Sequence, residues 1–333
     1  MNLKKNIALL RIIIYCQCNI FLLVMIFFII PGCKLSHSGL DSIIDPHIKP
    51  LKLNRDTTFT FTEGPVYDAE GILYFTDGTT GNIFSMSRER TFSRAVSGAN
   101  RPDGMMIDHD GNLVVCDYDG KRLDLYSPDG QLIRTLADSY NGKALNGPND
   151  VVIDRSGGIY FTDPFFGKPG APQDAEGVYF IPQGGELRRI CDHVSVPNGI
   201  ILTPDEKTLI IVDTQEPGIH AIDVRPGNKF VNHRIWGKVT LSPDKENGEK
   251  PRSGSVGLAM DELGNLYVAT DLGMEVFNSK GQSLGIIKFP EFKRPLNMTF
   301  DRNDPGVMII TAYESVYSLK MLTKGISFPQ FRK

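Results

Sequence analysis

The feature that most constrains this 333-residue chain is a unit that recurs six times between residues 60 and 320. Each unit has a turn with Gly or Pro, a short apolar segment, a turn with Asp and Gly, and a second apolar segment. The second apolar segments are residues 72–76, 113–116, 159–162, 209–212, 266–270 and 307–311. They lie roughly 40 to 57 residues apart, and self-similarity at such a period indicates a repeat architecture.

A third short apolar segment follows in every unit, and several units add a fourth after a turn such as 127–130. Four short strands per unit at this period are typical of a propeller blade. The chain lacks a long segment of helical period, which argues against a βαβ fold, and a solenoid would lack the Asp-Gly hairpin turns inside each unit. The sequence therefore predicts an all-β fold, a six-bladed β-propeller of four-stranded blades over residues 56–325.

The first 32 residues have the pattern of an export signal. Basic residues come first, residues 19–30 are apolar, and Ile30-Pro-Gly-Cys33 resembles a lipobox, in which Cys33 would be acylated. An uncleaved anchor and plain secretion are the alternatives. Residues 33–55 have little periodicity and are expected to form a tether. This pattern predicts a lipid-anchored protein of the cell envelope, facing the periplasm or the outer membrane, with no other membrane contact.

The charge and the cysteines exclude several classes of partner. The formal net charge is −3, and no basic stripe is present, which argues against nucleic acid. Outside the signal and Cys33, only Cys116 and Cys191 remain, either as buried free thiols or as a disulfide. No Cys and His spacing suggests zinc, and nothing indicates an oligomer.

The repeat also predicts where a functional site lies. The first strand of every blade lines the central channel, so residues at the same phase should form a ring. The residue five positions before the Asp of each first strand, or before its stand-in, is Glu63, Asp103, Asn149, Asn198, Val256 and Leu296. Carboxylate and amide oxygens that converge in this way are hard ligands suited to Ca²⁺. The alternative is that Asp and Asn occur here as turn residues.

A second set of acidic residues follows the second strands. These residues are Asp77, Asp117, Asp163, Asp213 and Asp271. Because second strands return to the face where first strands begin, the five side chains could form a negative funnel at the channel mouth. For each one taken alone, a role in the turn at the strand end is the simpler interpretation.

The segments at residues 61–66, 146–153 with 160–164, 196–199 and 264–270 resemble the regucalcin/gluconolactonase/luciferin-regenerating-enzyme family. The resemblance implies a six-bladed propeller that binds a divalent ion, often Ca²⁺, at the top of the channel and in many members hydrolyses lactones. It implies that Glu63 and Asn198 are metal ligands and that Asn149 is a ligand or a substrate contact. We also expect Asp213 to contact the substrate.

One position departs from the family pattern. The family has an acidic ligand in the fifth repeat, which is also its favoured base or nucleophile, whereas this chain has Val256 there. Asp103 or Asp271 could supply the missing carboxylate and activate water. The sequence therefore predicts a metal-dependent hydrolase of small lactones, and the alternative is a propeller that binds a ligand or partner without catalysis.

Overall fold

The computed structural model describes residues 39–166, 170–243 and 250–326. The predicted signal at 1–32 and the lipidation site at Cys33 lie outside these residues. Among the residues described, no helix has the length and apolar character needed to cross a membrane.

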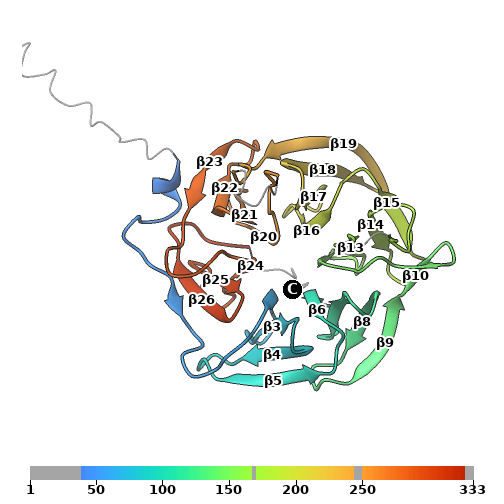
Figure 1. The fold of residues 1–333 in the computed structure, drawn as a ribbon, viewed down its shortest axis with the longest axis horizontal. Coiled ribbons are helices and arrows are strands. Elements are labelled where there is room, and N and C mark those ends of the chain that lie inside the picture. The colour runs from blue at the N-terminus through green and yellow to red at the C-terminus, as the bar shows by residue number, and fades with distance from the viewer. Residues whose placement is uncertain (1–38, 167–169, 244–249, 327–333) are drawn as a thin grey trace, which may run out of the picture. The chain divides into compact units, whose positions relative to one another are not determined.

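Six four-stranded antiparallel sheets surround a central axis, which confirms the predicted six-bladed propeller (Figure 1). The second strand of every blade begins and ends within one residue of the predicted segment. Blade 1 contains β2 (Thr62–Tyr67), β3 (Leu73–Asp77), β4 (Asn82–Met86) and β5 (Phe92–Ser97), and blade 2 contains β6 (Pro102–Ile107), β7 (Leu113–Asp117), β8 (Arg122–Tyr126) and β9 (Leu132–Ala137).

The remaining blades have the same antiparallel order. Blade 3 contains β12 (Val151–Ile153), β13 (Ile159–Asp163), β14 (Gly177–Ile181) and β15 (Arg188–Cys191), and blade 4 contains β16 (Pro197–Leu202), β17 (Thr208–Asp213), β18 (Gly218–Arg225) and β19 (Lys229–Lys238). Blade 5 contains β20 (Leu258–Met260), β21 (Leu266–Thr270), β22 (Gly273–Phe277) and β23 (Ser283–Ile287). Outside the blades lie β10 (Ser139–Tyr140), β11 (Lys143–Ala144) and the 3₁₀ helix η1 (Leu40–Ser42).

The sixth blade joins the two ends of the propeller. It contains β24 (Asn297–Phe300), β25 (Val307–Ala312), β26 (Ser315–Lys320) and, as its outermost strand, β1 (Leu51–Lys52). Leu51 pairs with Ser318, and Lys52 pairs with Tyr317. Ile43 and Ile44 are buried in the same hydrophobic cluster as the sixth blade. Part of the segment at 33–55 therefore packs onto the propeller and closes it.

The hydrophobic core lies between the blades. Every residue of β2 and β16 is buried, because an inner strand is covered on both faces by its neighbours. Between the first two blades, Val66 and Ile83 pack against Met105, Ile107 and Val115. Cys116 and Cys191 are both buried free thiols, which is one of the two alternatives that the sequence allows.

Asn54 fixes the closing strand through three hydrogen bonds. Its amide nitrogen donates to the carbonyls of Thr57 (2.9 Å) and Glu314 (2.8 Å), and its Oδ1 accepts the N–H of Val316 at 2.9 Å.

We expect Asn54→Ala to lower Tm by roughly 4 °C, because buried backbone groups lose their partners. Thermal unfolding followed by circular dichroism measures this, with exposed Lys52→Ala as the control. Equal melting of the two variants would show that Asn54 does not hold the closure.

Candidate functional site

Four of the six predicted ring positions gather at one end of the central channel. Glu63 on β2, Asp103 on β6, Asn149 just before β12 and Asn198 on β16 are all buried, with between 2% and 8% of each residue exposed. Glu63, Asp103, Asn149 and Asn198 are called the polar ring below. The phase of the repeat predicts this arrangement, and the Asn149 side chain donates to Asp103, on whose carboxyl the charge of Glu63 also acts.

Local irregularities in the inner strands point the ring side chains into the channel. The pairing of the first two strands shifts register directly after Glu63 in blade 1, and across Asp103 in blade 2 and Asn198 in blade 4. Such bulges redirect a side chain at the end of a strand. The sequence supplies Gly directly after each of these three residues, and the reason is steric.

Each of these glycines lies against the backbone of the next blade. A Cβ on Gly64 would stand 2.8 Å from the carbonyl oxygen of Asp103, and one on Gly199 would stand 2.1 Å from the carbonyl oxygen of Val256. Gly64 also has a φ of +47°, which a side chain would disfavour. The absence of side chains lets neighbouring inner strands approach closely, and this approach is what brings the ring residues together.

The two ring carboxyls are buried close to each other. Oε1 of Glu63 has no hydrogen-bond partner among the described atoms. Burial raises the pKa of Glu63 to about 7, against the opposing effects of Asn297, the Gly64 N–H and the Arg294 charge. Burial and, next, the charge of Glu63 raise the pKa of Asp103 well above its ordinary value. Nδ2 of Asn149 donates to Oδ2 of Asp103 at 2.8 Å, which fixes this carboxyl.

The polar ring has the donor set for a hard cation. The amide nitrogen of Asn149 donates to Asp103, and that of Asn198 donates to Oγ1 of Thr214 at 3.0 Å. In each residue the amide oxygen therefore points away from this partner. In the described ranges no group of three or more His, Cys, Asp and Glu has metal-binding geometry. A cation would therefore depend on the amides together with the unpartnered oxygen of Glu63, and oxygen ligands of this kind suit Ca²⁺.

At the ring phase itself, the fifth and sixth blades have apolar side chains, and the buried Asn297 of the sixth blade follows directly after. Val256 and Leu296 are both buried and apolar. Asp271, the second candidate for the missing carboxylate, is held instead by two guanidinium groups. Nε of Arg252 donates to its Oδ2 at 2.9 Å, and Nη1 of Arg294 donates to its Oδ1. The two cations compensate the charge of Asp271.

The other four acids that follow the second strands have structural partners. Oδ1 and Oδ2 of Asp213 accept backbone N–H groups from Ser195, Val196, Gln215 and Glu216. Asp77, Asp117 and Asp163 likewise accept N–H groups from the loop that leads into their own blade. A structural role in the turn at the strand end therefore accounts for these four residues. Asp271 differs from them, because the described partners of its carboxylate are the side chains of Arg252 and Arg294.

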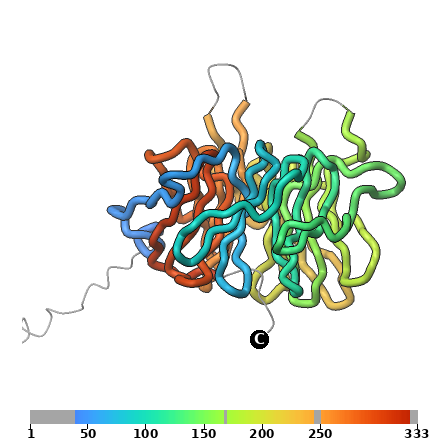
Figure 2. Tube along the Cα trace, turned by 90° about the horizontal axis from the view of Figure 1, so that it is seen from below, coloured from blue at the N-terminus to red at the C-terminus, as the bar shows by residue number. Residues whose placement is uncertain are grey.

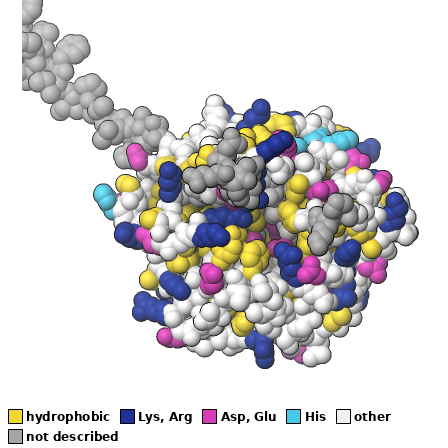
Figure 3. All heavy atoms as spheres, in the orientation of Figure 1, with side chains coloured by type: hydrophobic (Ala, Val, Ile, Leu, Met, Phe, Trp, Pro, Cys, Tyr) yellow, Lys and Arg dark blue, Asp and Glu magenta, His cyan; other side chains and the backbone are white. Residues whose placement is uncertain are grey.

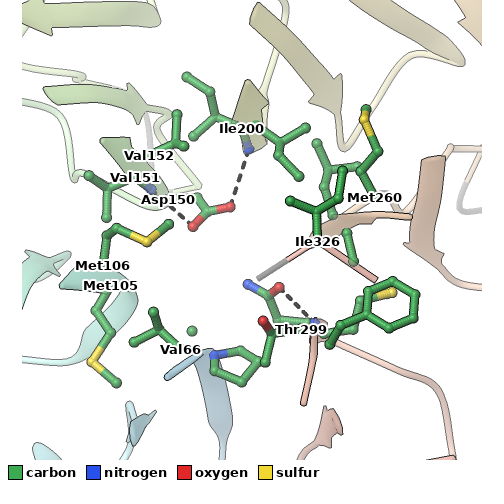
Figure 4. A pocket seen from close by; sticks show the side chains of 18 residues that line it. Val66, Met105, Met106, Asp150, Val151, Val152, Ile200, Met260, Thr299 and Ile326 are labelled. Atoms are coloured by element: carbon green, nitrogen blue, oxygen red, sulfur yellow. Dashed lines mark hydrogen bonds between the residues drawn. The ribbon is translucent and has the colours of Figure 1, made fainter. Parts of the chain in front are cut away.

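The sequence analysis missed Asp150, which lies in the channel beside the polar ring (Figure 4). Its oxygens accept the N–H groups of Val151 (2.9 Å) and Ile200 (3.2 Å). Burial, and then the charge of Glu63, raise the pKa of Asp150 to about 8. The repeat could have revealed Asp150, because the residue after the ring position is Gly in blades 1, 2, 4 and 5 but an acid in blade 3.

The segment that follows β13 leaves the propeller on the face where the ring lies, because Asp163 at the end of β13 accepts the N–H groups of Asn146 and Gly147. The segments next to residues 167–169 and 244–249 extend from the same face of the propeller (Figure 2). On that face, Lys and Arg side chains gather near the centre, beside acidic side chains (Figure 3). The channel mouth therefore combines buried carboxyls with exposed cations.

Comparisons with known proteins identify a family. A model of the SMP-30/Gluconolactonase/LRE-like region matches residues 84–137 and 132–314. A gluconolactonase from Zymomonas mobilis is 28% identical over 67% of this chain and 64% of its own length. Lactonase drp35 from Staphylococcus aureus strain N315 is 32% identical over 68% of this chain and 69% of its own length.

Solved structures show the same fold. A gluconolactonase from Xanthomonas campestris superposes with a TM-score of 0.72 at 29% identity, over 87% of this chain and 92% of its own. A calcium-binding regucalcin from Agrobacterium tumefaciens superposes with a TM-score of 0.69, over 86% of this chain and 98% of its own. Its identity of 17% supports the fold alone.

The raised pKa of Glu63 makes stability depend on pH. A carboxyl that titrates at about 7 in the folded chain and near 4.5 when unfolded disfavours folding increasingly as pH rises between these values. In the presence of a chelator, we expect Glu63→Gln to melt above the parent by several degrees at pH 8 and by less at pH 5. Glu262→Gln, at an exposed position, is the control. A difference that does not change with pH would contradict the raised pKa.

Proposed function

Because this chain belongs to the SMP-30/gluconolactonase/LRE-like family, we propose that it hydrolyses small lactones at the polar ring with the help of a divalent cation, most simply Ca²⁺. The observation that supports this most strongly is the unpartnered buried oxygen of Glu63 beside the Asp103 carboxyl. A buried carboxylate oxygen without a donor is costly unless a cation or a hydrogen bond compensates it, and here only Oε2 of Glu63 accepts the N–H of Gly64.

Glu63, Asn149 and Asn198 are the proposed ligands, and their burial restricts the side chains before anything binds. When bound, a divalent cation polarises a carbonyl and stabilises the negative charge that develops on its oxygen. The residues of this chain then have to place the lactone, hold a water molecule and move its proton.

Asp103 is the proposed base. Its Oδ2 is held by Asn149, which leaves Oδ1 to accept a proton from a water molecule as that water attacks the lactone carbonyl. The ester bond breaks, the ring oxygen takes a proton from Asp103, and the product is the open hydroxy acid. The raised pKa of Asp103 favours proton acceptance near neutral pH over an ordinary aspartate.

The surroundings of the two candidate bases favour Asp103 over Asp271. Asp271 is bound to Arg252 and Arg294 through both of its oxygens, so these oxygens are already engaged by guanidinium N–H groups. Asp213 has its oxygens occupied by backbone N–H groups, so substrate contact through that carboxylate would compete with loop structure.

Ligand binding without catalysis is the second candidate function, and Val256 is the observation that favours it. A ring with one carboxylate fewer has less ligand charge, and ligand charge sets Ca²⁺ affinity. The experiment below separates the two functions, because it measures cation binding and turnover on the same protein.

We expect Asp103→Asn to lower kcat for a simple sugar lactone by on the order of 10²–10⁴-fold, the usual cost of losing a general base. Proton release at constant pH measures turnover, and titration calorimetry measures Ca²⁺ binding. Asp110→Asn, at an exposed turn of the same blade, is the control. Full activity in Asp103→Asn would reject the assignment, and tight Ca²⁺ binding by a parent protein that hydrolyses no lactone would favour the binding function.

We also propose, from the sequence, that residues 1–32 direct export and that Cys33 is acylated, which would anchor the protein in the cell envelope. In an expressing bacterium, we expect the chain to take up labelled fatty acid and to sediment with membranes. Cys33→Ser should lose the label, whereas Cys18→Ser should keep it. A labelled Cys33→Ser protein, or an unlabelled parent, would contradict lipidation at this position.

A further inference from the structure

The mouth of the channel is cationic over blades 5 and 6, where the polar ring is interrupted. Arg294 and Lys293 belong to the loop that leads into β24, next to the apolar ring positions Val256 and Leu296. Neither apolar side chain can compensate a charge. The charged side chains close to these two positions in the chain are Lys293 and Arg294, and Arg294 is bound to Asp271.

Arg294 is held in a fixed orientation. Its Nη1 donates to Asp271 and, at 3.2 Å, to the carbonyl of Gly254, and its Nε lies 3.3 Å from the hydroxyl of Tyr313. Only 17% of the side chain is exposed. None of these hydrogen bonds uses Nη2, which leaves one edge of the guanidinium with donors available for a ligand.

The charge of Arg294 reaches the polar ring, since it is among the groups that lower the pKa of Glu63. The guanidinium also lies beside the fifth-blade ring position, because its Nη1 donates to the carbonyl of Gly254, two residues before Val256. The ammonium of Lys293 adds a second cation 4.9 Å from the centre of the Tyr313 ring. The carboxylate of Asp271 compensates the charge of Arg294, and the charge of Lys293 remains as an excess positive charge beside blades 5 and 6.

From this arrangement we infer that the substrate has an anionic group of its own, a carboxylate or a phosphate, which binds Arg294 and Lys293 while the lactone carbonyl lies at the polar ring. The inference rests on the proposed lactonase function and narrows its substrate to acidic sugar lactones. A planar guanidinium with a free edge matches an oxyanion through paired, charge-assisted hydrogen bonds.

The test compares substrates that differ in this group. Glucono-lactone is neutral, glucaro-lactone has a carboxylate, and 6-phosphoglucono-lactone has a phosphate. We expect kcat/KM for one of the charged lactones to exceed that for the neutral one by about 10-fold or more, the effect typical of a charge-assisted pair. Whichever charged lactone is preferred identifies the anion. A preference that fell with added salt would support the charge mechanism.

The variants assign the preference to these residues. Arg294→Met and Lys293→Met should reduce the ratio between charged and neutral lactones toward one, and Arg294→Lys should restore part of it. Lys280→Met, in the turn between β22 and β23 at the other end of blade 5, should leave the ratio unchanged. Lys293 is exposed, so its variant tests the inference even if Arg294→Met fails to fold.

Binding provides a readout that needs no turnover. By calorimetry, we expect glucarate, a dicarboxylate, to bind the parent about 10-fold more tightly than gluconate, and to lose this advantage in Lys293→Met. Hydrolysis of the neutral lactone without any preference for a charged one would overturn this inference and leave the lactonase function standing. Absent turnover together with tighter glucarate binding would reject the lactonase function and support the anion site.

Discussion

The close approach of the inner strands at the axis is the constraint on which the site depends. Gly64 and Gly199 bring the backbone of one blade against that of another, and any larger residue would separate them. The same approach forces Glu63 and Asp103 out of water, which destabilises their ionised forms. A propeller that needed only a packed axis could place apolar residues there, as Val256 and Leu296 do. Two buried acids at the axis are therefore better explained by chemistry than by folding.

The blades also divide the mouth into two unlike halves. Blades 1 to 4 have carboxyl and amide groups at the ring positions, whereas blades 5 and 6 have Val256 and Leu296 there, with Arg294 and Lys293 in the loop before β24. Asp271 belongs to the basic half by its contacts, since it orients two guanidiniums. Val256 thus lies in a sector of the site whose charged side chains are mostly basic.

The repeat allowed the blades and the polar ring to be predicted, because equivalent phases in a propeller occupy equivalent places. Side-chain partners that come from irregular loops could not be predicted in the same way. The pairing of Asp271 with Arg294 joins residues 23 apart in sequence, through a loop that no other blade repeats. The two-residue strand β1 has exposed side chains and therefore no apolar pattern to reveal it. Asp150 could have been predicted, because it is an acid at a position where four other blades have Gly. The prediction considered only the preceding ring position, Asn149.

The sixth blade gives the molecule a particular order of assembly. Asn54 bonds to Val316 across 262 residues of sequence, so the contact forms only after nearly the whole chain is available. Contacts of such long range are slow to form, because the chain loses much entropy when its ends meet. A chain still emerging from the ribosome can build individual blades, yet its circle stays open until the last one is made. That delay would suit a polypeptide that has to be threaded unfolded through a translocation pore before it closes.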